Sequence, residues 1–174
     1  MLENPDPSKR NKPVIFPLKM DLTTNESIIP SPKRYSHKSV IDGSKIDVYA
    51  YPVEQILAEK MSACLNHGDE GTRSRDFFDI YALKTFEKEK INKKLLRASI
   101  INEFENNGQN DALINPISAF DDLRNSRVIN QQWERQKKQF VSNKVNLKLG
   151  TTIDVATDLL NDAGFKRSDP QPQH

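Results

Sequence analysis

A lysine lies in the middle of an apolar helical stripe. At about 100° per residue, Lys60 falls on the same helix face as Ile56 and Leu57. A buried ammonium group loses its hydration, so lysine is rarely buried without a partner. We therefore expect Lys60 to contact an anion, either a carboxylate of this chain or the phosphate of a ligand. The alternative is that its aliphatic stem follows the stripe and its ammonium reaches water at the rim.

Two carboxylates follow on a second helical segment. Asp76 and Asp79 lie among aromatic residues that cover several sides of this segment, which is typical of a buried helix. Buried carboxylates need partners. The first helical turn alone would favour an acid at Asp76 through the helix dipole, but Asp79 has no such explanation. Arg73 and Arg75 could pair with either acid bidentately, so Lys60 and this Arg-Asp-x-x-Asp segment together indicate an anion-handling site.

The elements before these residues are predicted to be strands. Residues 14–22 alternate between apolar and polar side chains, and residues 45–51 form a second strand that is entered by a turn at Asp42 and Gly43. Residues 23–39 contain several proline and polar positions, and we expect a long loop there. Two strands are too few for a stable sheet of their own.

From Pro52 onward the pattern is helical. Asn92 is expected to be a helix N-cap and Gly108 a C-cap, and Trp133 is expected in the core. Helices are predicted over 52–66, 75–88, 93–107, 117–141 (as a pair) and 151–164. Strands followed by helices indicate an α+β fold.

Composition excludes several classes of protein. The 174 residues carry a net charge of +2, 36% hydrophobic residues and 1 Cys. A disulfide scaffold, a cysteine zinc site and a membrane span are therefore excluded, and we expect a cytoplasmic setting. His37, His67 and His174 are too dispersed to predict a histidine metal site or a catalytic triad. Cys64 lies on the apolar stripe, where a buried, unreactive thiol is expected.

Two of these segments resemble motifs of the AbiEii/AbiGii toxin family, which comprises nucleotidyltransferase-like toxins of type IV toxin–antitoxin and phage abortive-infection systems. The third family motif, an apolar helix with a central Ala-x-Lys, is matched by Ala58-Glu59-Lys60. The fourth, an Arg/Lys-Asp-x-x-Asp helix, is matched by Arg75-Asp76 and Asp79. The resemblance covers roughly residues 14–142.

The resemblance implies the C-terminal part of a nucleotidyltransferase-like fold, with few strands, followed by a helical bundle. It implies transfer of a nucleoside monophosphate from an NTP to an RNA or protein acceptor, with Mg²⁺ as the metal. Lys60 would hold phosphate oxygens, helped by Arg73 and Arg75. Asp76 or Asp79 would orient the nucleotide or hold these cations in place.

Asp21 resembles the acid of the second family motif, so it is the candidate Mg²⁺ ligand; the alternative is an ordinary polar residue at a strand edge. The first family motif, a Gly-Ser turn followed by an Asp-x-Asp pair, should precede Asp21, and no residues there match it. Gly43-Ser44 comes at the wrong place in the motif order and is interpreted as a turn. We therefore expect a truncated family member that is inactive alone, with a missing N-terminal half that an upstream reading frame could supply.

The expected organisation has four parts: a disordered leader (1–12), a remnant of the nucleotidyltransferase-like core (13–88), a helical C-terminal region (89–165) and a disordered tail (166–174). The partners implied by the resemblance are a cognate antitoxin and a tRNA or other RNA acceptor.

The alternative function is a non-enzymatic module that binds RNA or regulates a partner protein. The basic residues that could touch phosphates are Lys33, Arg34, Lys93, Lys94, Arg97, Lys137 and Lys138. Such charge runs are also common on solvated helix faces, and a net charge of +2 gives little long-range steering.

Overall fold

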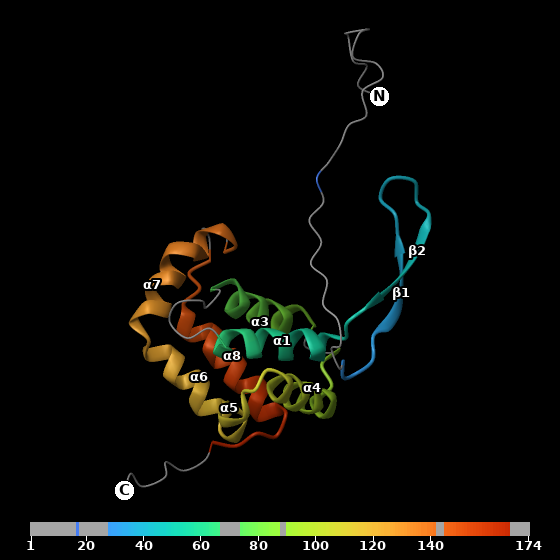
Figure 1. The fold of residues 1–174 in the computed structure, drawn as a ribbon. Helices are drawn as coiled ribbons and strands as arrows, with labels where there is room; N and C mark the ends of the chain where they lie inside the picture. The colour runs from blue at the N-terminus through green and yellow to red at the C-terminus, as the bar shows by residue number, and fades with distance from the viewer. Residues whose placement is uncertain (1–16, 18–27, 67–73, 88–89, 142–144, 168–174) are drawn as a thin grey trace, which may run out of the picture.

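The computed structural model describes residues 17, 28–66, 74–87, 90–141 and 145–167. These residues form a two-stranded antiparallel sheet and a helical body (Figure 1), which confirms the α+β class. The elements in chain order are β1 (Lys33–Lys38), β2 (Lys45–Ala50), α1 (Val53–Asn66), α3 (Ser74–Glu87), α4 (Lys93–Asn106), α5 (Asn110–Ile114), α6 (Pro116–Asn125), α7 (Arg127–Gln136), the short 3₁₀ turn η3 (Lys137–Gln139) and α8 (Leu149–Asp162).

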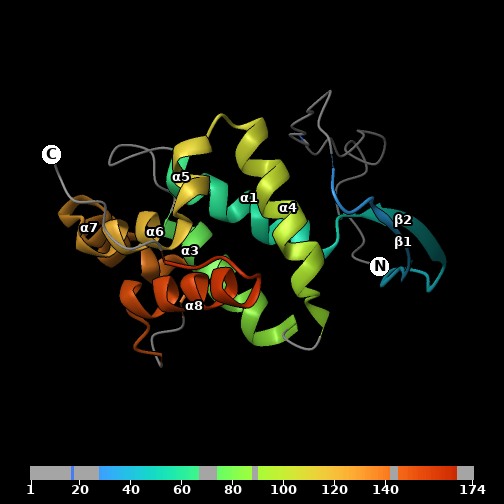
Figure 2. The same ribbon diagram turned by 90° about the horizontal axis from the view of Figure 1, so that it is seen from below.

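Strands β1 and β2 form a hairpin that projects from the helical body in both ribbon views (Figures 1 and 2). Its turn contains Gly43 with φ of 73°, and Asp42 Oδ1 accepts a hydrogen bond from Ser44 N at 3.1 Å. The predicted turn is therefore confirmed. The prediction of a loop throughout 23–39 is wrong, because β1 lies within it. The strand has no apolar run, and its structure comes from pairing with β2.

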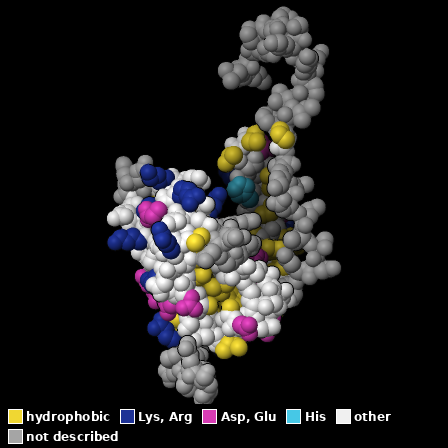
Figure 3. All heavy atoms as spheres, turned by 60° about the vertical axis from the view of Figure 1, so that its left-hand side comes forward, with side chains coloured by type: hydrophobic (Ala, Val, Ile, Leu, Met, Phe, Trp, Pro, Cys, Tyr) yellow, Lys and Arg dark blue, Asp and Glu magenta, His cyan; other side chains and the backbone are white. Residues whose placement is uncertain are grey.

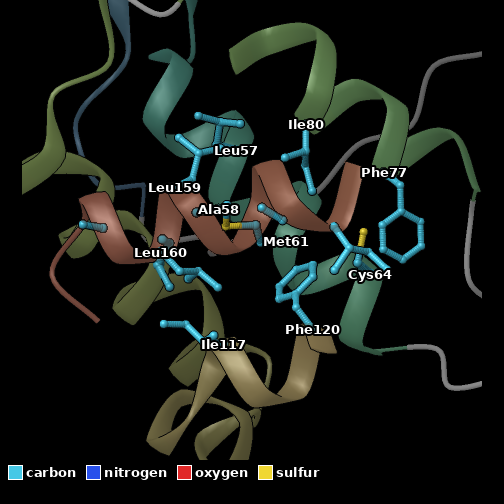
Figure 4. Close-up of a cluster of buried hydrophobic side chains, with 14 of the residues drawn as sticks. Leu57, Ala58, Met61, Cys64, Phe77, Ile80, Ile117, Phe120, Leu159 and Leu160 are labelled. Atoms are coloured by element: carbon cyan, nitrogen blue, oxygen red, sulfur yellow. The ribbon is translucent and has the colours of Figure 1, made fainter. Parts of the chain in front are cut away.

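The helical body is built around α1. Helices α3 and α4 both pack on α1, and α8 packs on α3 and α6. Figure 4 shows the result: side chains from these helices meet in one apolar cluster. Leu57 and Met61 of α1 are fully buried in it, as are Phe77 of α3, Phe120 of α6 and Leu159 of α8. This cluster holds the start of α3 against the middle of α1.

Local signals fix the ends of α4. The Asn92 side chain accepts hydrogen bonds from Lys94 N and Leu95 N, and Gly108 follows the helix with φ of 68°, so both predicted caps are confirmed. The backbone N–H of Asn92 also donates to the buried Glu54 carboxylate at 2.7 Å. That bond joins the start of α4 to the start of α1.

Other elements differ in detail from the sequence prediction. Helix α5 was not predicted, and α8 begins at Leu149 rather than at Thr151. The strand expected over 14–22 lies outside the described residues except for Pro17, which is in neither a helix nor a strand. The four-part division of the chain stays a prediction. No helix among the described residues is long and apolar enough to cross a membrane.

Candidate functional site

The candidate site lies between the middle of α1 and the first turns of α3. Leu57, Ala58 and Met61 of α1 are completely buried, and Lys60 lies among them in sequence with 31% of its side chain exposed. The Lys60 stem thus follows the packed helix, while its ammonium reaches the edge of the core. Phe77 and Ile80 anchor α3 in the same core. This packing directs the carboxylates of α3 toward Lys60.

The Lys60 ammonium contacts both predicted acids. It lies 2.6 Å from Asp76 Oδ1 and 2.9 Å from Asp79 Oδ2. The Asp76 side chain is only 5% exposed, whereas that of Asp79 is 25% exposed. The expectation that Lys60 pairs with a carboxylate of this chain is therefore confirmed. We call Lys60, Asp76 and Asp79 the lysine–diaspartate cluster.

Electrostatics keep Lys60 charged. Partial burial alone would lower the pKa of Lys60, but its hydrogen bonds to Asp76 and Asp79 outweigh burial and raise the pKa above the ordinary 10.5. Lys60 is therefore a permanent cation at neutral pH. It can bind an anion or stabilise negative charge, but it cannot act as a general base.

Two polar atoms beside the cluster lack partners. Asp76 Oδ2 and Ser74 Oγ are both buried, and neither has a hydrogen-bond partner among the described residues. Leaving a buried carboxylate oxygen unsatisfied costs free energy. A ligand that donates hydrogen bonds to this oxygen, while placing an anionic group against Lys60, would satisfy both.

The arginines are less closely engaged than the sequence suggests. Arg75 Nε lies 3.9 Å from Asp79 Oδ1, and 76% of the Arg75 side chain is exposed. This contact is loose rather than bidentate, because Asp79 already accepts Lys60. Arg75 is therefore available to an anionic ligand, while Arg73 and Asp21 lie outside the described residues.

The cluster does not fit a Mg²⁺ ion. No group of three or more potential metal ligands is found in the part of the chain that the structure describes. Asp76 and Asp79 converge on an ammonium, whose charge would repel a divalent cation placed between them. The cluster by itself therefore offers no site for a divalent metal ion.

The remaining reactive groups do not extend the site. Cys64 is completely buried, and burial raises the pKa of its thiol well above the ordinary 9.0. The expectation of a buried thiol is therefore confirmed. His37 lies on the exposed hairpin, and His67 and His174 are outside the described residues. Trp133 is 1% exposed, which confirms its predicted place in the core.

Sequence reasoning did not single out Ser74. A serine at the start of a helix is usually an N-cap, so its type alone does not reveal a site. Ser74 is the first residue of α3, and what distinguishes it is a buried hydroxyl with no hydrogen-bond partner among the described residues, which can be seen only in the folded chain.

Comparison with protein-family models gives one match. A model described as the nucleotidyl transferase AbiEii toxin of type IV toxin–antitoxin systems matches residues 11–156. No curated protein and no solved structure matches the chain. The family match spans the lysine–diaspartate cluster and most of the helical body.

Proposed function

Because the chain belongs to the AbiEii family of toxin nucleotidyltransferases of type IV toxin–antitoxin systems, we propose that the lysine–diaspartate cluster binds the phosphates of a nucleoside triphosphate. The observation that carries this proposal is the buried Asp76 carboxylate, which holds Lys60 at 2.6 Å while its second oxygen has no hydrogen-bond partner among the described residues. A nucleotide offers both complements: phosphate oxygens for Lys60, and ribose or base donors for Asp76.

In this proposal Lys60 is the group that binds negative charge. During nucleotidyl transfer, charge develops on the phosphoryl oxygens, and a fixed cation stabilises it without reorganisation. Asp76 and Asp79 position Lys60 from two sides, and Asp76 also accepts a hydrogen bond from the nucleotide. Arg75 and Arg73 supply further positive charge at the phosphates.

Metal binding needs residues beyond the cluster. Nucleotidyl transfer uses divalent ions, commonly Mg²⁺, held by several carboxylates. Asp21 is our candidate for one ligand. The sequence contains no Gly-Ser turn with an Asp-x-Asp pair ahead of Asp21, and Gly43-Ser44 is part of the hairpin turn. We therefore propose that the residues of this sequence do not hold the catalytic metal by themselves, and that a Gly-Ser and Asp-x-Asp motif from outside them completes the site.

A transfer assay tests this proposal. The chain is incubated with α-³²P-labelled nucleoside triphosphates, Mg²⁺ and bulk tRNA, alone and together with the product of any upstream reading frame that encodes the first motif. We expect labelling only from the combination, and its loss in Lys60→Gln but not in Lys94→Gln, an equal charge change on an exposed face of α4.

Three results would count against the proposal. Labelling by the chain alone would refute the need for a second polypeptide. Labelling by the combination that survives Lys60→Gln would refute the role of the cluster. Absence of any such reading frame in the upstream DNA would refute the proposed source of the first motif.

The second candidate function is a binding module without chemistry. It is favoured by a basic helix face on α7 whose cations have no carboxylate partners among the described residues. The transfer assay separates the two, because a binding module would retain RNA in both arms and label it in neither. Adding the antitoxin that the family implies to the same assay would show whether the antitoxin blocks transfer.

A further inference from the structure

Helix α7 has two distinct faces. Ile129 and Trp133 point into the core and are each 1% exposed. On the opposite side, polar and charged side chains line a shallow hollow of about 570 Å³. The residues around this hollow are Arg127, Asn130, Gln131, Glu134 and Arg135. Lys138 of η3 continues the face beyond the end of α7.

Positive charge dominates this face. Figure 3 brings the α7 side of the molecule forward and shows Lys and Arg side chains gathered there, with few acids among them. The only acid in the α7–η3 segment is Glu134, and Lys137 already neutralises it at 2.7 Å. Arg127, Arg135 and Lys138 are exposed and have no carboxylate partner among the described residues. Their charge is therefore available to an external anion.

Other basic residues considered from the sequence are less available. Arg34 pairs with Asp47 at 2.6 Å, and Lys93 pairs with Asp162 at 2.8 Å. Arg97 lies over the Phe165 ring, 4.3 Å from its centroid. Arg34, Lys93 and Arg97 are therefore engaged by other groups of this protein, whereas the cations of the α7 face are not engaged by the described residues.

The chemistry of the α7 face argues against a protein or membrane partner. Protein interfaces depend on buried aromatic or aliphatic anchors, and the only sizeable apolar side chain exposed on α7 is Val128, at 39%. A helix that binds a membrane surface needs a free apolar face. The apolar face of α7 is used in the core. Guanidinium groups and amides instead match phosphates and ribose hydroxyls.

We propose that the α7–η3 face, defined by Arg127, Gln131, Arg135 and Lys138, is a docking surface for RNA. The three cations bind successive phosphates of the backbone, and the Gln131 amide hydrogen-bonds a 2′-hydroxyl group. The face extends about 17 Å along the helix axis, which suits a short stretch of single strand.

The segment that follows η3 contacts α3. Phe140, just after η3, lies 5.2 Å from Phe78 of α3, centroid to centroid. Phe78 precedes Asp79 in α3, the helix that carries both acids of the lysine–diaspartate cluster. The inference deepens the proposed function by naming where an RNA acceptor docks. Binding is measured without nucleotide, however, so either proposal can fail alone.

Equilibrium binding to an RNA oligonucleotide of about 16 nucleotides, measured over a range of salt concentrations, tests the proposal. The key variant is Arg127→Gln/Arg135→Gln/Lys138→Gln. We expect it to bind at least about tenfold more weakly than the wild type, and to lower the slope of log affinity against log salt by about two units. The matched control, Lys33→Gln/Lys38→Gln/Lys45→Gln, removes the same charge from the hairpin and should bind within about threefold of the wild type.

Two further arms make the test specific. Arg127→Lys/Arg135→Lys keeps the charge and should retain most of the affinity, which ties any loss to charge, and an unchanged circular dichroism spectrum of the triple variant shows that the loss is not a folding defect. DNA of the same sequence should bind more weakly than RNA. Equal losses in the two triple variants, no binding of the wild type at low salt, or equal affinity for DNA would each overturn the proposal.

Discussion

The Lys60 ammonium lies 2.6 Å from Asp76 Oδ1, and the other oxygen of the same carboxylate is buried with no hydrogen-bond partner in the part of the chain that the structure describes. The described residues therefore satisfy only one of the two Asp76 oxygens. A buried ion pair that serves stability alone would be expected to use both oxygens. This arrangement is the reason that we propose a ligand-binding role for the pair.

The first prediction concerns coupling within the cluster. Lys60→Met removes the closest cation from a carboxylate that is 5% exposed, and should lower the free energy of unfolding by about 2 to 3 kcal/mol. Asp76→Asn should cost less, because Lys60 keeps Asp79. The double variant should lose less than the sum of the two, with a coupling of at least about 1 kcal/mol in urea unfolding. Strict additivity would show that the contact carries no energy.

The second prediction concerns the single cysteine. Burial raises the pKa of the Cys64 thiol, and nearby Asp76 raises it further. We expect a thiol reagent such as DTNB to label Cys64 no faster than the protein opens, and to label it at once in denaturant. Rapid labelling of the native protein at neutral pH would mean that α1 is not packed as described.

The third prediction concerns pH. Hydrogen bonds from Lys93 and then Lys84 lower the pKa of Asp162 below 3.8. The folded state then holds Asp162 ionised more strongly than the unfolded state does. Its stabilisation is present above pH 3.8 and is lost as the pH falls through the folded-state pKa.

Asp162→Asn should therefore lower the free energy of unfolding by about 0.5 to 1 kcal/mol at neutral pH, since the carboxylate is partly exposed and screened. The difference from the wild type should shrink as the pH falls below 3.8, and in high salt at neutral pH. Thermal unfolding at several pH values measures it. A difference that is constant down to acid pH would exclude an ionic origin.

The fourth prediction concerns the end of α8. Gly164 has φ of +85°, and an added Cβ would meet only Arg97 Nη1, at 3.8 Å. There is room for a side chain, so Gly164→Ala should lower the free energy of unfolding by about 1 kcal/mol through backbone strain alone. Gly164→Asn should cost less. Gly150→Ala is the matched control, because Gly150 has no positive φ. If the two alanine substitutions lowered the free energy of unfolding equally, backbone strain at the positive φ of Gly164 would be contradicted.

Sequence reasoning predicted the helices well where periodicity and caps agree. The apolar stripe of α1 and the Asn92 cap of α4 are both signals within one short stretch of sequence, and both are observed in the structure. Strand β1 was missed because its sequence, Lys33–Lys38, lacks apolar alternation and its structure depends on a partner strand. Helix α5 has only 5 residues and no side-chain cap, so no local signal marks it.

The candidate site was also predictable only in part. The position of Lys60 on an apolar face requires an anion, and the acids of the following helix were the natural candidates. The unpaired Asp76 oxygen and the buried Ser74 hydroxyl were not predictable, because burial depends on how α3 packs against its neighbours. Likewise, the free charges of Arg127 and Arg135 depend on which face of α7 Trp133 turns toward the core.

The most direct test of the central claim is a nucleotide titration. Calorimetry should detect binding of nucleoside triphosphates to the wild type and to Lys94→Gln. In Lys60→Gln the affinity should fall by about tenfold or more, because a charge-assisted contact to phosphate is lost. Equal affinities of the wild type and Lys60→Gln, with both folded by circular dichroism, would contradict the claim that the lysine–diaspartate cluster binds nucleotide phosphates.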